Sequence, residues 1–151
     1  MIARDLMTKD VATVSPDTPV GEIAQLLLKR GISAVPVVDA NGAAIGMVSE
    51  GDLLGRDEEE RKARRDWWLA MLAEGEELHP DFLKTIQRPQ QTARQVMTTP
   101  VITVGETAKA AEIARILTEH RIKRVPVVRD GRVVGIVSRA NLLQAVAGDQ
   151  D

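Results

Sequence analysis

The stretches GMVSEGDLL (residues 46–54) and GIVSRANLL (residues 135–143) repeat one phrase within a single chain. Both contain a glycine, a short apolar run, a serine and a pair of leucines in the same order. The acid of the first copy, Asp52, is replaced by an amide, Asn141, in the second. A phrase repeated in this way indicates an internal duplication.

The repetition extends outward from both stretches. Residues 3–14 (ARDLMTKDVATV) align with residues 93–104 (ARQVMTTPVITV), and residues 31–39 (GISAVPVVD) align with residues 121–129 (RIKRVPVVR). The segment between the copies has no counterpart and holds every aromatic residue of the chain. The sequence therefore predicts a first repeat, a helical insert with a linker, and a second repeat, over residues 1–54, 55–91 and 92–151.

Each repeat begins with a predicted strand and a predicted helix. The apolar runs at residues 11–14 and 101–104 are typical of short strands. In the first copy, Thr18 is expected to cap the following helix, with Pro19 at its first position and Gly31 at its end. Apolar residues recur three and four positions apart on one face of each helix, namely Val20, Ile23, Ala24, Leu27 and Leu28, and then Ala110, Ile113, Ala114 and Leu117.

Each repeat ends with two predicted strands and a second helix. The strands join through residues 39–42 in the first copy and through Asp130-Gly131, a hairpin signal, in the second. Ser49 and Ser138 then open the last helices. The predicted fold class is α/β (α+β), with two β-α-β-β-α repeats packed with pseudo-two-fold symmetry and a helical insert. Because one such repeat is too small to bury its sheet well, we expect ligand-sized clefts between the copies.

Composition excludes several classes of protein. The chain has 151 residues, 44% of them hydrophobic, and a net charge of −2. This balance gives no electrostatic attraction to nucleic acid or to anionic membranes. No apolar run is long enough to cross a bilayer, and there is no cysteine for disulfides or metal binding. We expect a cytoplasmic protein with neither nucleic acid nor membrane as a partner.

The sequence offers little for catalysis. The only histidines are His79, in the insert, and His120, at a predicted helix end. There is no Walker-type phosphate loop, no metal-ligand spacing and no nucleophile beside a base. We therefore predict that the chain is not an enzyme, holds no metal and requires no cofactor.

The duplicated unit, with VPVVD followed by IGMVSEGDLL and with VPVVRDGRVVGIVSRANLL, resembles a tandem pair of cystathionine-beta-synthase (CBS) domains, the Bateman module. The resemblance covers residues 3–54 and 92–147. It implies a compact disc that dimerises through its helices and regulates a partner protein. It also implies an adenosine-containing ligand: AMP, ADP or ATP foremost, with NAD or S-adenosylmethionine as further candidates.

The resemblance assigns a role to the repeated phrase. The signature Gly-x-x-Ser/Thr-x-x-Asp of the family is matched by Gly46, Ser49 and Asp52, and implies that the carboxylate accepts hydrogen bonds from ribose hydroxyls. Asn141 has one acceptor oxygen where Asp52 has two, which predicts weaker binding. The alternative is that Asp52 merely caps its helix, since Ser-x-x-Asp is also a capping box.

The resemblance also implies residues for the rest of the ligand. Basic residues before the VPVV strand of the other copy meet the phosphates in nucleotide-binding relatives, and Lys123, Arg124 and Arg139 are the candidates here. They could instead form a solvated charged edge. Thr13, Val35 and Pro36 are expected near the adenine. We predict one competent site, and a weaker second site at Ser138, Asn141 and Thr103.

The insert leaves two interpretations open. Trp67 and Trp68 could cover an edge of their own repeats, or form a patch for a partner protein or a second subunit. Tandem CBS proteins of bacteria resemble this chain in carrying such a Trp-Trp insert. The favoured function is a ligand-sensing regulatory module, and the alternative is a dimerisation or interaction scaffold that acts through this insert without binding nucleotide.

Overall fold

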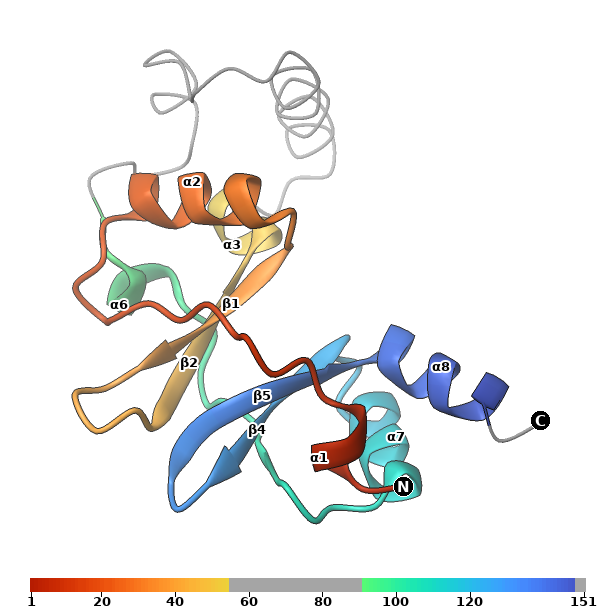
Figure 1. Ribbon diagram of the computed structural model, residues 1–151. Coiled ribbons are helices and arrows are strands. Elements are labelled where there is room, and N and C mark those ends of the chain that lie inside the picture. Colours follow the sequence, from red (N-terminus) through yellow and green to blue (C-terminus); the bar gives the residue numbers. More distant parts are fainter. Residues whose placement is uncertain (55–90, 149–151) are drawn as a thin grey trace. The chain divides into compact units, whose positions relative to one another are not determined.

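The computed structural model describes residues 1–54 and 91–148, drawn in colour in Figure 1. They form two compact units. Unit 1 contains Met1–Ala12, Val38–Ala44 and the described residues from Pro100 onward, and unit 2 contains Thr13–Val37 and the described residues from Ile45 to Thr99. Both units combine helices with a small sheet, which confirms the predicted mixed α/β class. Apart from Gln91, the predicted insert lies outside the described residues.

The compact units do not coincide with the sequence repeats. The leading helix of the first repeat, α1 (Ala3–Leu6), belongs to unit 1, where the backbone N–H of Ala3 donates to the carbonyl of Ala108 at 2.8 Å. The leading helix of the second repeat, α6 (Ala93–Val96), belongs to unit 2, where the N–H of Ala93 donates to the carbonyl of Thr18 at 2.9 Å. Each repeat therefore supplies its leading helix to the unit built mainly by the other.

Unit 2 is built mainly from the first repeat. Its elements are α2 (Val20–Arg30), strands β1 (Ala34–Val38) and β2 (Ala44–Ser49) without their end residues Val38 and Ala44, α3 (Glu50–Leu54) and α6. The two strands pair in one sheet, and α2 packs against α3, as Figure 1 shows. The predicted apolar face of α2 is buried at Val20, Ile23, Ala24 and Leu27, while Leu28 is half-buried.

Unit 1 is built mainly from the second repeat. Its elements are β3 (Val104–Gly105), α7 (Ala110–Glu119), β4 (Arg124–Arg129), β5 (Arg132–Ser138) and α8 (Arg139–Gly148), together with α1. β3 pairs parallel with β4, and β4 pairs antiparallel with β5. Asp130 and Gly131 both have positive φ, 53° and 79°, as a two-residue turn of the Asp-Gly type requires. The hairpin predicted from this dipeptide is confirmed.

The first predicted strand of each repeat is shorter in the structure. Residues 11–14 form only a single bridge, between Val14 and Val37, and residues 101–104 contribute only Val104 to β3. The neighbouring strand explains this. Pro36 in β1 and Pro126 in β4 have no N–H, so a longer parallel ladder along that edge would lack a donor.

Helix ends follow the sequence in part. Gly31 ends α2 in the left-handed conformation (φ 61°), as predicted. The expected cap by Thr18 is wrong: Pro19 occupies the N-cap position, and the Thr18 hydroxyl instead accepts the N–H of Ser15 at 3.0 Å. In α7, Ile113 and Leu117 are buried as predicted, but Ala114 is exposed.

The glycine of each repeated phrase lies against the side chain of a methionine. A Cβ built on Gly46 would collide with the side chain of Met97, and one built on Gly135 would collide with that of Met7. Both methionines directly follow a leading helix, α6 or α1. Glycine at these positions is therefore explained by the close approach of the exchanged segments.

Candidate functional site

The repeated phrase of the first copy holds its acid in a helix cap. The Oδ2 atom of Asp52 accepts hydrogen bonds from the backbone N–H of Ser49 at 2.8 Å and from the Ser49 hydroxyl at 3.1 Å. Ser49 ends β2 and Asp52 lies in the first turn of α3. The capping alternative is thus correct for one carboxylate oxygen, and it fixes the position of Asp52 relative to the strand.

The second oxygen of Asp52 meets a residue that the sequence did not single out. Asp52 Oδ1 accepts a hydrogen bond from the hydroxyl of Thr98 at 3.2 Å. Thr98 lies beside β2, because it exchanges two backbone hydrogen bonds with Met47, at 2.8 and 3.2 Å. Alignment of the repeats assigns Thr98 to the second copy, so only the exchange of leading segments brings it to the acid of the first.

The second copy repeats the cap with an amide. The Oδ1 atom of Asn141 accepts the N–H of Ser138 at 2.7 Å and the Ser138 hydroxyl at 2.9 Å. The side-chain amide nitrogen is what remains to face a ligand, and an NH2 group only donates. Asp52 and Asn141 thus cap their helices alike but present opposite hydrogen-bonding groups.

The candidate basic residues lie in unit 1, at the end of its sheet. Arg124 on β4 pairs with Ser138 on β5, and the N–H of Arg139 donates to the carbonyl of Lys123 at 3.1 Å. The structure therefore brings Lys123, Arg124 and Arg139 together beside Ser138. Their contribution to a phosphate site with Asp52, which belongs to unit 2, stays a prediction from the sequence.

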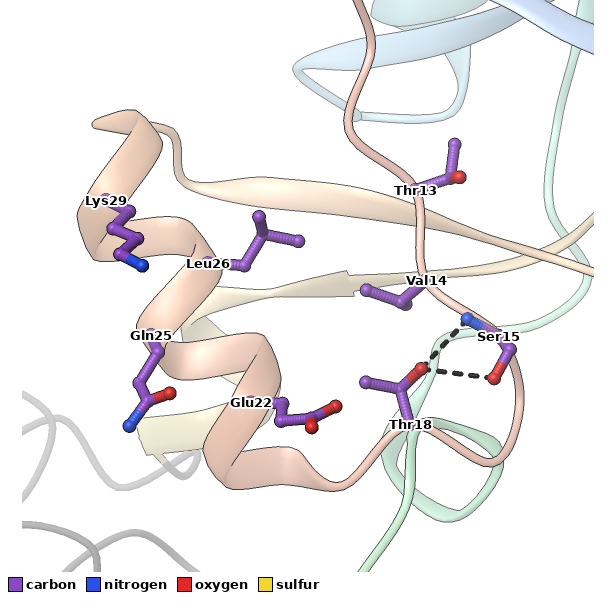
Figure 2. Close-up of a pocket in the computed structure, with 8 residues that line it drawn as sticks. All are labelled: Thr13, Val14, Ser15, Thr18, Glu22, Gln25, Leu26 and Lys29. Carbon is purple, nitrogen blue, oxygen red and sulfur yellow. Dashed lines mark hydrogen bonds between the residues drawn. The ribbon is translucent and has the colours of Figure 1, made fainter.

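The residues expected near adenine differ in accessibility. Thr13 is exposed, and in Figure 2 its side chain is directed away from α2. Val35 is fully buried, and Pro36 is also buried, with its carbonyl accepting the N–H of Val14 at 3.1 Å. The side chain of Val35 therefore belongs to the core of unit 2. Thr103, assigned to the weaker site, is half-buried and directly precedes β3.

A groove of about 390 Å³ lies on unit 2 between α2 and the segment before it (Figure 2). Its volume is in the range of small-molecule sites. Apart from Thr13, no residue predicted to bind ligand lines it. The lining consists of Thr13, Val14, Ser15, Thr18, Glu22, Gln25, Leu26 and Lys29.

Among the residues that the structure describes, no helix has both the length and the apolar character needed to span a membrane. Within the same ranges, 1–54 and 91–148, no three His, Asp or Glu side chains gather where a metal ion could bind. Trp67 and Trp68 lie outside these ranges, so the Trp-Trp insert stays a prediction.

Both repeats of the chain are similar to known proteins. The sequence profile of the CBS domain matches residues 3–59 and 93–148. CBSX2, a chloroplastic CBS domain-containing protein of Arabidopsis thaliana, is 30% identical over 149 residues, covering 93% of this chain and 61% of CBSX2. Across four curated relatives, the chain spans between 31% and 62% of their length.

Solved structures agree with the sequence comparison. The CBS domain of a membrane protein from Sphaerobacter thermophilus has a TM-score of 0.71 at 34% identity, covering 95% of this chain and 86% of that one. The CBS domain pair of MJ0100, in complex with 5′-methylthioadenosine and S-adenosylmethionine, has a TM-score of 0.69 at 25% identity, covering 99% and 98%. CBSX2 in complex with AMP has a TM-score of 0.70 at 23% identity, covering 99% and 98%, a likeness of fold. With two matched copies and the fold of these pairs, the chain belongs to the CBS domain family as a tandem CBS pair.

Proposed function

We propose that this chain is a regulatory module that binds an adenosine-containing ligand through the ribose, with Asp52 as the principal acceptor. The observation that carries the proposal is that the two carboxylate oxygens of Asp52 have different hydrogen-bond partners. Oδ2 is held by the two donors of Ser49, while Oδ1 takes only the Thr98 hydroxyl from the described residues. A fixed carboxylate with remaining acceptor capacity suits a hydroxyl-rich ligand.

The ligands of the relatives support the adenosine class. CBSX2 binds AMP, and the MJ0100 pair binds 5′-methylthioadenosine and S-adenosylmethionine. These three molecules share adenine and a ribose with free 2′- and 3′-hydroxyls. AMP, ADP and ATP are the ligands we favour, with NAD and S-adenosylmethionine as further members of the class.

Regulation requires that the ligand discriminate between conformations. A ligand shifts an equilibrium only by its difference in affinity for two states. We propose that occupancy changes the packing of the module and that a partner protein reads this change. The proposal includes a homodimer in the cytoplasm that performs no chemistry of its own.

The test is a calorimetric titration of the full chain, freed of bound nucleotide, with AMP, 5′-methylthioadenosine and S-adenosylmethionine. Asp52→Asn is the informative variant, because Asn141 shows that an amide preserves the cap. We expect about one ligand per chain and a dissociation constant raised about tenfold or more in the variant, since a charge-assisted bond is lost.

The matched control is Asn141→Ala, the same position in the second copy, which should leave the dissociation constant of the first site nearly unchanged. An Asp52→Asn variant that binds as tightly as the wild type would refute the role of Asp52. Failure of the wild type to bind any of the three ligands would refute the sensor and favour the interaction scaffold, with Trp67 and Trp68 as the next residues to replace.

A further inference from the structure

We propose that Thr98 is a ligand-binding residue that shares the ribose diol with Asp52. The inference rests on the proposed function and adds to it a residue from the other repeat. One ribose hydroxyl donates to Asp52 Oδ1, and its neighbour donates to the Thr98 hydroxyl oxygen. The competent site is thus a pair of acceptors, one from α3 and one from the segment after α6.

The count of acceptor positions on Asp52 leads to this arrangement. A carboxylate has about four lone-pair positions, two on each oxygen. The backbone N–H and hydroxyl of Ser49 occupy both positions on Oδ2, and the Thr98 hydroxyl occupies one on Oδ1. One position on Oδ1 remains, which is enough for one ribose hydroxyl but not for two.

Thr98 supplies the acceptor for the second hydroxyl. A carboxylate cannot donate, so the hydrogen of the Thr98 hydroxyl points toward Asp52, and both lone pairs of the Thr98 oxygen stay directed elsewhere. The two acceptor oxygens lie 3.2 Å apart. This separation is comparable to that of the oxygens of a vicinal diol, so neighbouring hydroxyls can meet both at once.

The pair is accessible and held in place. Thr98 is exposed and Asp52 is half-buried, so the two oxygens lie at the surface of unit 2. The two backbone hydrogen bonds with Met47 fix the position of Thr98, and the helix cap with Ser49 fixes the position of Asp52. A preorganised pair of acceptors costs the ligand little conformational entropy on binding.

The second copy lacks such a pair. Thr8 corresponds to Thr98 and makes the same backbone exchange, with Ile136 at 2.9 and 3.1 Å. Its neighbouring phrase presents Asn141, whose oxygen is occupied by both donors of Ser138. An amide nitrogen in place of a carboxylate oxygen removes one of the two acceptors, so Thr8 is a matched control for Thr98.

The experiment compares two probes on four proteins by calorimetry. The probes are AMP and 2′,3′-dideoxy-AMP, which keeps the base and phosphate but lacks the diol. The proteins are the full-length wild type, Thr98→Val, Thr98→Ser and Thr8→Val. Valine keeps the β-branched shape and the strand pairing but loses the hydroxyl, whereas serine keeps the hydroxyl.

We expect Thr98→Val to weaken AMP binding about tenfold, as for the loss of one hydrogen bond to the ligand, and to leave dideoxy-AMP binding unchanged. Thr98→Ser should restore most of the affinity for AMP, and Thr8→Val should match the wild type. A merely structural role of Thr98 would weaken both probes equally.

The outcomes separate the two proposals. Wild-type binding of AMP that Asp52→Asn weakens and Thr98→Val does not would overturn the role of Thr98 and leave the proposed function standing. Equal weakening of both probes by Thr98→Val would also overturn it. Failure of the wild type to bind AMP, 5′-methylthioadenosine or S-adenosylmethionine would overturn both.

Discussion

At the scale of single residues, Asp52 uses its two oxygens for different tasks. One oxygen completes the cap between β2 and α3, and the other faces Thr98 and the surface. Asn141 performs only the first task, because its single oxygen is committed to Ser138. The replacement of Asp52 by Asn141 at the equivalent position therefore preserves the helix cap and removes an acceptor.

Asn141→Asp is expected to give the second copy the acceptor that it lacks. The cap should survive, since Asp52 makes the same bonds to Ser49. Free energies of unfolding from urea titrations should then change by less than about 0.5 kcal/mol, as for an ordinary surface replacement. In calorimetry with AMP, a second and weaker binding event should appear.

The comparison variant is Asn141→Ala, which offers neither acceptor nor cap. It should show no second event and should lose roughly 1 kcal/mol of stability with its cap. An unchanged stoichiometry in Asn141→Asp would mean that the acceptor is not what limits the second copy.

Residue spacing in the sequence predicts the Ser49–Asp52 pair of the candidate site but not the contact of Asp52 with Thr98. The pairing of Ser49 with Asp52 is local, three residues apart on one turn, so the sequence alone predicts it. The contact of Asp52 with Thr98 spans 46 residues and depends on which unit receives the segment after α6. No local pattern contains that information. Burial of Val35 likewise follows from packing that spacing does not reveal.

At the scale of elements, the two long helices end alike with different residues. The N–H of Ile32 donates to the carbonyl of Leu27, and the N–H of Ile122 donates to the carbonyl of Leu117, both at 3.0 Å. Each helix therefore ends with the same hydrogen bond between residues five positions apart, as in a Schellman motif. The left-handed position is Gly31 in α2 but Arg121 in α7, with φ of 61° and 54°. Only glycine adopts this conformation without a steric cost.

Gly31→Ala should therefore destabilise the protein, and Arg121→Gly should stabilise it. Apart from its neighbours in the chain, nothing lies within 4 Å of a Cβ at Gly31, so the cost of alanine is conformational. We expect about 1 kcal/mol lost in the first variant and roughly 0.5–1 kcal/mol gained in the second, from urea unfolding monitored by circular dichroism.

Gly31→Asn is the control, because asparagine tolerates the left-handed region better than alanine. It should lose less stability than Gly31→Ala. Equal losses in the two variants would indicate that something other than backbone conformation sets the cost.

The element order was predictable because it depends on local patterns. The apolar face of α2, its final glycine and the Asp-Gly hairpin are each encoded within a few residues. The lengths of the first strands were not, since they depend on a proline in the neighbouring strand. Thr18 does not cap α2, because its hydroxyl is hydrogen-bonded to the backbone N–H and to the hydroxyl of Ser15.

At the scale of the whole molecule, α8 carries an apolar surface. Ala145 faces the core of unit 1, whereas Leu143 is 70% exposed and Val146 is 57% exposed on the same helix. The two exposed residues are three positions apart and so lie on one face. This surface fits the predicted homodimer, in which helices of two copies would meet.

Analytical ultracentrifugation should therefore show a dimer of the wild type, and Leu143→Glu should shift it toward monomer, because a buried unpaired charge opposes association. Ile32→Glu is the control, since Ile32 is 36% exposed and lies outside α8. A monomeric wild type, or a Leu143→Glu variant that dimerises as well as the control, would contradict the assignment of this face.

The exchange of leading helices between the repeats limits how this chain can be divided. A first repeat made alone, as residues 1–54, would carry α1 without the α7 and β5 that it packs against, and would lack α6. Either half should fold only by complementation with the other. The second repeat, which carries Asn141, is therefore needed for the structure even if it binds no ligand. It supplies Ala93 to a buried position in unit 2 and Thr98 as a hydrogen-bond partner of Asp52. After the ancestral duplication, loss of ligand binding by one copy would not have made that copy dispensable.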